Sequence, residues 1–196
     1  MKISITSFIL LVSFIGFAQN SSYWQQNADY KMEVNMDVKS FTYKGKQEIT
    51  YTNNSPDTLK KVYFHLFNNA FQPGSEMDAR LQSISDPDRR MVKTFKTPEK
   101  TTYKSRINAL KPDEIGYLKI TDFKQEGQLA LTKTIGTILE VQLLNPVLPH
   151  QKSTFTMNFD GQVPVQIRRS GRNNEEGIAL SMSQWYPKMA EYDFEG

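Results

Sequence analysis

The sequence predicts a mainly β fold, an antiparallel β-sandwich or saddle-shaped sheet domain with a short helix in an insertion. Apolar and polar residues alternate over several stretches, and 12% of the 196 residues are aromatic. A period of two gives a sheet one apolar face, and aromatic side chains bury enough area to fill a core between two sheets. The spacing of turn signals predicts seven or eight strands.

The clearest strand signal comes first in the domain. Residues 30–38 alternate strictly between apolar and polar side chains. A turn region formed by residues 41–43 with Gly45 should lead to a second strand at 47–51, so that the two strands form a hairpin. The stretch Asn-Asn-Ser-Pro-Asp at 53–57 predicts the next turn.

The middle of the chain interrupts the strand pattern. Residues 61–67 (KVYFHLF) are apolar on both faces and predict a central strand covered on both sides. Residues 68–108 hold prolines and many charges, and predict an irregular excursion over the surface. Within it, Ser75 is the expected N-cap of a short helix that ends near Ile84 and has Asp78 in its first turn. Further strands are expected at 117–121, 139–143, 154–159 and 178–182.

The N-terminus has the pattern of an export signal. Lys2 precedes an apolar stretch at 3–17, and Gly16 and Ala18 are the small residues that a signal peptidase reads. We expect a signal peptide at 1–18, with the mature domain at 19–196 in the periplasm or outside the cell. The alternative is a membrane anchor, but the apolar stretch is shorter than the roughly 20 residues that cross a bilayer. No membrane contact is expected after cleavage.

Composition narrows the range of partners. The chain has no cysteine, so stability has to come from the core and from any partner domain rather than from disulfides. The net charge of +3 is too small to predict a nucleic acid as partner.

No complete catalytic site is visible in the sequence. The histidines are His65 and His150, and neither an H-E-x-x-H zinc motif nor a G-x-S-x-G nucleophile motif is present. We therefore assign no catalytic residue and no metal ligand to this chain. Asp86 and Asp88 form a carboxylate pair of the kind that glycoside hydrolases and calcium sites use, so an independent hydrolase is one alternative.

Two segments are candidates for binding. Arg168, Arg169 and Arg172 lie within five residues and form either an arginine fork for carboxylates or a solvated turn. Residues 181–187 (SMSQWYP) place Trp185 and Tyr186 between a glutamine and a proline. This arrangement suits the wall of a cleft, and the alternative is a core tryptophan beside an edge tyrosine.

The order of several short motifs resembles a known family. They closely resemble the N-terminal domain of the aminopeptidase N family of zinc metallopeptidases, in its exported Bacteroidetes-type members, over about residues 23–196. The motifs are YKGKQ (43–47), TNNSPDTL (52–59), VYFHL (62–66), NNAFQPG (68–74), GQVP (161–164), RRSGR (168–172) and QWYPK (184–188).

The resemblance implies a saddle-shaped β-domain that precedes a thermolysin-like catalytic domain. The family's zinc motif lies in that second domain, and neither it nor the family's G-x-M-E-N motif is present in this sequence. The chain alone is therefore expected to lack activity and to need no cofactor, whereas zinc is expected in the intact parent. Because the family's sequence would continue beyond 191–196, a truncated reading frame or fragment is expected, and a true end is the alternative.

The resemblance also implies roles for single residues. In the family, a segment reading roughly T-Q-x-E binds the free amino group of the peptide, and Ser183 to Tyr186 match it. Gln184 matches the family's Gln, whereas Tyr186 stands where the family has Glu, which puts ordinary aminopeptidase specificity in doubt. Gln184, Trp185 and Tyr186 are thus the expected substrate-binding residues. Arg168, Arg169 and Arg172 are expected to contact the catalytic domain or a peptide carboxylate.

The expected function is that of a non-catalytic domain. It would pack on the missing catalytic domain of the same polypeptide and wall the cleft for a peptide substrate. The alternative is a stand-alone exported β-sandwich binding module without enzymatic activity.

Overall fold

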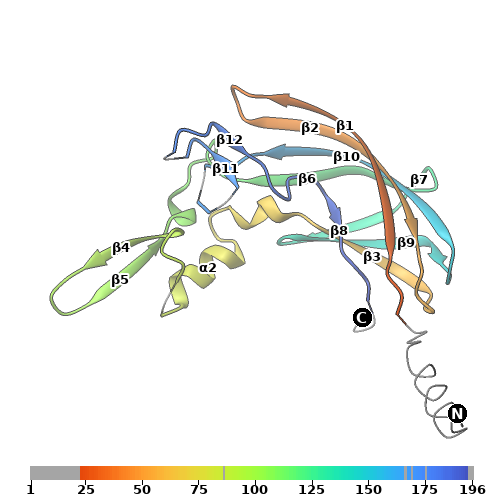
Figure 1. Ribbon diagram of the computed structural model, residues 1–196, viewed down its shortest axis with the longest axis horizontal. Coiled ribbons are helices and arrows are strands. Elements are labelled where there is room, and N and C mark those ends of the chain that lie inside the picture. The colour runs from red at the N-terminus through yellow and green to blue at the C-terminus, as the bar shows by residue number, and fades with distance from the viewer. Residues whose placement is uncertain (1–22, 86, 166, 169, 175, 194–196) are drawn as a thin grey trace, which may run out of the picture.

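Two antiparallel sheets pack face to face, and an insertion projects from one end of them (Figure 1). The computed structural model describes residues 23–193 except 86, 166, 169 and 175. The expected signal peptide at 1–18 lies outside the described residues. Within the described residues, each helix is too short or too polar to span a bilayer. The expected mainly β, antiparallel fold with a short helix in an insertion is confirmed.

The first sheet has five strands and arches over the rest of the molecule (Figure 1). Its strand order is β1 (Asn27–Asp37), β2 (Thr42–Thr52), β10 (Lys152–Gln162), β6 (Tyr117–Gln125) and β7 (Gln128–Leu129). The expected hairpin between the first two strands is confirmed by their continuous antiparallel register. Alternation of small and large exposure along β2 and β10 shows that one face of each strand is buried.

The turn of this hairpin differs from the expected one. It lies before Thr42, and Phe41 adopts a left-handed backbone conformation with φ of 57°. Tyr43 and Gly45, which we expected in the turn, are paired residues of β2 opposite Met36 and Val34. The expectation is wrong because the ring of Phe159 occupies the space where a Cβ at position 45 would lie. Glycine at this position makes room for the ring and does not form a turn.

The second sheet has four strands in the order β13 (Lys188–Met189), β3 (Leu59–His65), β9 (Ile138–Val147) and β8 (Leu131–Ile135). Strand β3 is internal, as expected, because β13 and β9 flank it. It is not covered on both faces, since Val62 and Phe64 are buried whereas Tyr63 is 41% exposed. The strand therefore presents one face to the core and one to solvent.

The insertion has more regular structure than expected. It contains η2 (Phe67–Ala70), α2 (Glu76–Ser83), β4 (Val92–Lys96), β5 (Thr101–Ser105) and η3 (Ile107–Ala109). The helix prediction is confirmed, because the Ser75 hydroxyl caps α2 by accepting the Asp78 N–H at 3.1 Å. The β4–β5 hairpin was not predicted and projects from the molecule (Figure 1). A separate small core holds the insertion together, made of Leu81, Met91, Val92, Ile107 and Ile167.

The main core lies between the two sheets and is rich in aromatic rings. Phe64 of the second sheet meets Phe123 of the first with ring centroids 5.5 Å apart, and Phe123 in turn lies 5.8 Å from Phe155.

The remaining two-stranded pair consists of β11 (Gly171–Arg172) and β12 (Leu180–Ser181). Strand β12 is shorter than the strand expected at 178–182. Tyr192 stacks on Trp24 at 5.7 Å, so the two ends of the described chain lie side by side.

Candidate functional site

The segment between β12 and β13 packs against the buried face of the five-stranded sheet. Trp185 is half-buried at the centre of this packing, and its ring centroid lies 5.7 Å from that of Tyr43 and 6.3 Å from that of Phe159. Tyr186 lies edge-on to Trp185 at 5.4 Å. The two aromatic residues predicted to bind substrate therefore extend the main core, and each keeps part of its surface exposed.

Hydrogen bonds from buried side chains fix the backbone of this segment. The hydroxyl of Tyr43 donates to the carbonyl oxygen of Trp185 and accepts the Asn68 amide at 3.0 Å. The Gln47 amide donates to the Pro187 carbonyl oxygen at 3.0 Å. Burial raises the pKa of the Tyr43 phenol far above its ordinary value, so the hydroxyl keeps its proton and stays a donor.

Like the preceding Ser183, Gln184 is exposed in this fixed segment. Its φ of 56° is a left-handed conformation, which few residues other than glycine adopt without strain. The neighbouring backbone is tethered on both sides, because the Ser183 N–H donates to the Ser170 hydroxyl at 3.2 Å and Trp185 is held by Tyr43. The exposed glutamine thus stands on a constrained backbone at the surface of the domain.

A pocket of about 410 Å³ lies beside this segment, with Tyr30, Tyr51, His65 and Lys188 in its wall. The ring of Tyr186 packs edge-on against the ring of Tyr30, which lines the pocket, and the two ring centroids are 5.6 Å apart. The Tyr30 hydroxyl accepts the Met189 N–H at 2.9 Å, and burial raises the pKa of this phenol. Burial, with the nearby charge of Lys188, lowers the pKa of His65, so this imidazole is neutral at pH 7.

The described residues do not fit a zinc ion. Among them, no three His, Asp or Glu side chains gather closely enough to hold a metal. The His65 ring stacks on Phe67 with centroids 4.8 Å apart, and His150 is exposed in a turn with φ of 61°. No catalytic step can therefore be derived through zinc in this part of the chain.

The arginine segment divides into residues with different roles. The guanidinium of Arg172 lies 4.6 Å above the Phe41 ring and donates to the carbonyl oxygens of Val163, at 3.2 Å, and Asp113. The guanidinium of Arg172 thus bonds within its own domain, so fewer of its N–H groups can bind a partner. Arg168 is exposed, with its Nε 3.5 Å from a carboxylate oxygen of Asp88. Arg169 lies outside the described residues.

Asp88 does not have the environment of a catalytic carboxylate. Arg90 donates from Nε to Oδ1 at 2.9 Å and from a terminal nitrogen to Oδ2 at 2.6 Å. These hydrogen bonds lower the pKa of the Asp88 carboxyl to about 2, so it is ionised throughout the neutral range. A general acid needs a raised pKa, and Asp86, its expected companion, lies outside the described residues.

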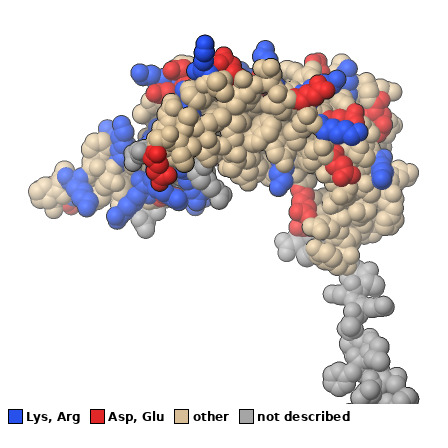
Figure 2. Space-filling model, turned by 45° about the horizontal axis from the view of Figure 1, so that its top comes forward, with Lys and Arg blue, Asp and Glu red and all other residues tan. Residues whose placement is uncertain are grey.

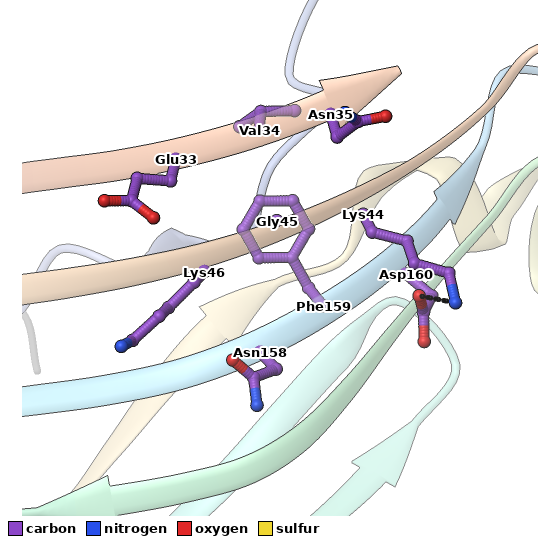
Figure 3. Close-up of a pocket in the computed structure, with 9 residues that line it drawn as sticks. All are labelled: Glu33, Val34, Asn35, Lys44, Gly45, Lys46, Asn158, Phe159 and Asp160. Carbon is purple, nitrogen blue, oxygen red and sulfur yellow. Dashed lines mark ion pairs between the residues drawn. The ribbon is translucent and has the colours of Figure 1, made fainter. Parts of the chain in front are cut away.

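A shallow hollow of about 430 Å³ lies over Gly45, where β1, β2 and β10 run side by side (Figure 3). The Phe159 ring lies at Gly45, and Lys44 pairs with Asp160 at 3.8 Å beside it. Glu33 and Lys46 complete a balanced set of two acidic and two basic side chains. The hollow is open, and the charges of the four side chains cancel. Its wall includes Phe159, whose ring packs against Trp185.

Our sequence analysis missed two features of the site. Tyr43 and Gln47, which anchor the backbone of residues 185 and 187, are more than 130 positions away from them in the chain. Arg89, Arg90 and Arg106 join Arg168 around one pocket. A usable signal existed for this second feature, because residues 89–106 contain seven basic residues against one acidic residue.

Comparison with known proteins gives structural matches at low identity. No protein-family model matches the chain, and no curated protein matches its sequence. The M1 zinc metallopeptidase from Deinococcus radiodurans is similar at 11% identity and a TM-score of 0.43, with 78% of this chain and 25% of that chain covered. A mutant two-domain M1 zinc metallopeptidase bound to L-arginine is similar at 12% identity and 0.46, with 83% and 27% covered.

Both of these solved structures are M1 zinc metallopeptidases. The chain spans about a quarter of the length of these structures.

Proposed function

We propose that this chain is the non-catalytic N-terminal β-domain of an exported zinc metallopeptidase of aminopeptidase type. In the intact protein it packs on the catalytic domain of the same polypeptide and forms one wall of the substrate cleft. Zinc and its ligands would belong to that second domain, where the metal would supply Lewis-acid activation for peptide hydrolysis.

The observation that carries this proposal is the fixed presentation of Gln184. Its side chain is exposed, whereas the adjacent Trp185 is held by a buried hydroxyl and packs in the core. Binding groups held on a rigid support lose little conformational entropy when a ligand arrives. This geometry supports a role for Gln184 in contact with a peptide at the domain surface.

The chemistry of the segment indicates what part of a peptide it would meet. The Gln184 amide oxygen and the Tyr186 hydroxyl can both accept a hydrogen bond from a free amino group. Neither carries a negative charge near neutral pH, so the pair would select a charged amine less strongly than a carboxylate does. We infer a substrate-facing wall that tolerates peptides with weakly charged or blocked amino termini.

A second candidate is a stand-alone exported binding module. Within the described residues 178–193, the large apolar side chain that is well exposed is Ile178, at 48%. Larger exposed fractions occur at Leu129 and Leu131, at the edge formed by β7 and β8. An interface with a large catalytic domain normally covers more apolar surface than the C-terminal segment offers.

The gene and a binding experiment together test the proposal. The reading frame beyond the codon for Gly196 is sequenced, and any domain that it encodes is produced separately and mixed with this chain. We expect codons for H-E-x-x-H in frame and a one-to-one complex by size-exclusion chromatography with light scattering. A stop codon at this point, or an encoded metallopeptidase domain that ignores this chain, would favour the stand-alone module instead.

A further inference from the structure

A further pocket, of about 450 Å³, lies at the base of the β4–β5 hairpin. Its wall comes from two parts of the chain, the loop around β4 and β5 and the loop after β10. Four guanidinium groups contribute to the wall, from Arg89, Arg90, Arg106 and Arg168. Figure 2 shows a dense group of basic side chains at this end of the molecule.

The positive charge of this pocket exceeds the acidic charge around it. Asp88 lies beside the pocket and is already shared by Arg90 and Arg168. Glu176 is the acidic residue in the described wall. The described groups therefore carry four positive charges against two negative ones, and the excess is concentrated around one cavity rather than spread over a surface.

Contacts within the loops hold two of the arginines in place. Arg106 donates to the Arg90 carbonyl oxygen at 2.7 Å, and Arg90 makes its two hydrogen bonds to Asp88. The small core under the hairpin includes Ile167, the residue before Arg168, and so joins the two loops. Guanidinium groups positioned in this way can bind an oxyanion with little loss of side-chain entropy.

The hairpin above the pocket adds charge of the same sign. Residues 89–106 hold seven basic residues and one acidic residue, a net charge of +6, so the remainder of the chain carries −3. Lys93 and Lys104 are directly opposite each other in the β4–β5 register. Like charges at opposed positions destabilise a two-stranded pair unless a counter-charge is nearby.

We propose that this arginine pocket is a binding site for a multiply charged oxyanion, with the lysines of the hairpin guiding the anion toward it. Planar guanidinium groups bind phosphate and carboxylate oxygens through paired hydrogen bonds, and both ligand types share this chemistry. A cavity of this volume holds a group of two or three phosphates or a tricarboxylate. The site lies wholly in this chain, so it does not depend on the metallopeptidase proposal.

Isothermal titration calorimetry with two probes tests the site. Sodium tripolyphosphate and sodium citrate are titrated into the purified protein at pH 7 and constant ionic strength. We expect one-to-one binding of at least one probe, and the tighter of the two identifies phosphate or carboxylate as the preferred source of the anion. Absence of stoichiometric binding by both probes would overturn the proposal.

A charge-matched pair of variants separates the pocket from general charge effects. Arg89→Ala/Arg168→Ala removes two exposed side chains of the pocket, and Lys60→Ala/Lys133→Ala removes two charges from the four-stranded sheet. We expect the dissociation constant to rise at least tenfold in the first variant and less than twofold in the second, with unchanged circular dichroism in both. Equal weakening in the two variants would mean that the anion only screens net charge, which contradicts a site.

Discussion

At the scale of single residues, two glycines and two aromatic rings define the packing beneath the candidate site. Phe159 lies against Gly45 on the neighbouring strand, and Tyr43 lies against Gly161 in the same way. A Cβ added at Gly45 would fall 2.1 Å from the Phe159 ring, and one at Gly161 would fall 2.1 Å from the Tyr43 ring. The two rings therefore need glycine opposite them, and both rings contact Trp185.

The substitution Gly45→Ala tests this packing. We expect it to lower the free energy of unfolding by about 1–3 kcal/mol, because a buried ring has to leave its position to admit the methyl group. Urea denaturation should show a lower midpoint with an unchanged slope. Lys46→Ala, at the exposed neighbouring position, is the control and should change stability by less than about 0.5 kcal/mol. A Gly45→Ala protein as stable as the control would contradict the arrangement.

The hydroxyl of Tyr43 links the core to the backbone of the candidate site. Tyr43→Phe keeps the ring but leaves the Trp185 carbonyl and the Asn68 amide without this partner. We expect a loss of about 1–3 kcal/mol, the cost of unsatisfied buried polar groups. Thermal unfolding followed by tryptophan fluorescence measures it.

Tyr63→Phe is the matched control for that hydroxyl. Its ring is 41% exposed and its hydroxyl makes a long contact of 3.4 Å with Glu140. We expect little change in stability for this variant. Equal effects at Tyr43 and Tyr63 would show that the buried hydroxyl does not hold the segment.

At the scale of elements, Asp78 joins the helix of the insertion to the chain around it. Its carboxylate accepts the Gly74 N–H at 2.9 Å, the Asn108 amide at 3.1 Å and the Gln82 amide at 3.1 Å. Burial opposes ionisation, but hydrogen bonds from these groups and from Ser105 outweigh it and lower the pKa of Asp78. The insertion is thus tied together by an ionised carboxylate near the N-terminus of α2.

This carboxylate predicts an acid dependence for stability. Because the folded-state pKa lies below the unfolded value near 3.8, the contribution is complete above that value and is lost as pH falls through the folded pKa. We expect Asp78→Asn to lose about 2 kcal/mol at pH 7 and progressively less below pH 4. Denaturant titrations at pH 3 and pH 7 check this, with the exposed Asp29→Asn as control. A pH-independent difference would remove Asp78 as the cause.

The elements differ in how well the sequence predicted them. The alternation at residues 30–38 marked β1 because one face of that strand is more buried than the other. Strand β8 was missed because all five of its residues are exposed and no periodic burial is imposed on them. The β4–β5 hairpin was missed for a similar reason, since four of the five residues of β4 are exposed and its sequence is rich in lysine.

The candidate site was predicted only in part, and the reason lies in chain distance. Residues 184–186 could be singled out because aromatic and polar side chains are adjacent in the sequence. Their anchors could not, and the basic stretch at 89–106 does not show by itself that Arg168 joins it, because both depend on contacts between segments far apart in the chain. For Arg168, the partner Asp88 is 80 positions earlier. Only the tertiary fold brings such residues together.

At the scale of the whole molecule, charge and packing divide the domain into two regions. The segment around Trp185 packs on the main core, whereas the lysine-rich β4–β5 hairpin projects from the molecule (Figure 1). The described part of the chain has candidate binding groups in both regions but no cluster of metal ligands.

The proposed function assigns peptide hydrolysis to a second domain, so we expect this domain to lack turnover when it is produced alone. A peptidase assay on the purified protein with aminoacyl substrates, with and without added zinc, combined with metal analysis, tests it most directly. We expect no turnover under either condition and less than a tenth of an equivalent of bound zinc, roughly the level of adventitious metal. Turnover that persists in the presence of a chelator, or one tightly bound zinc ion per chain, would contradict it.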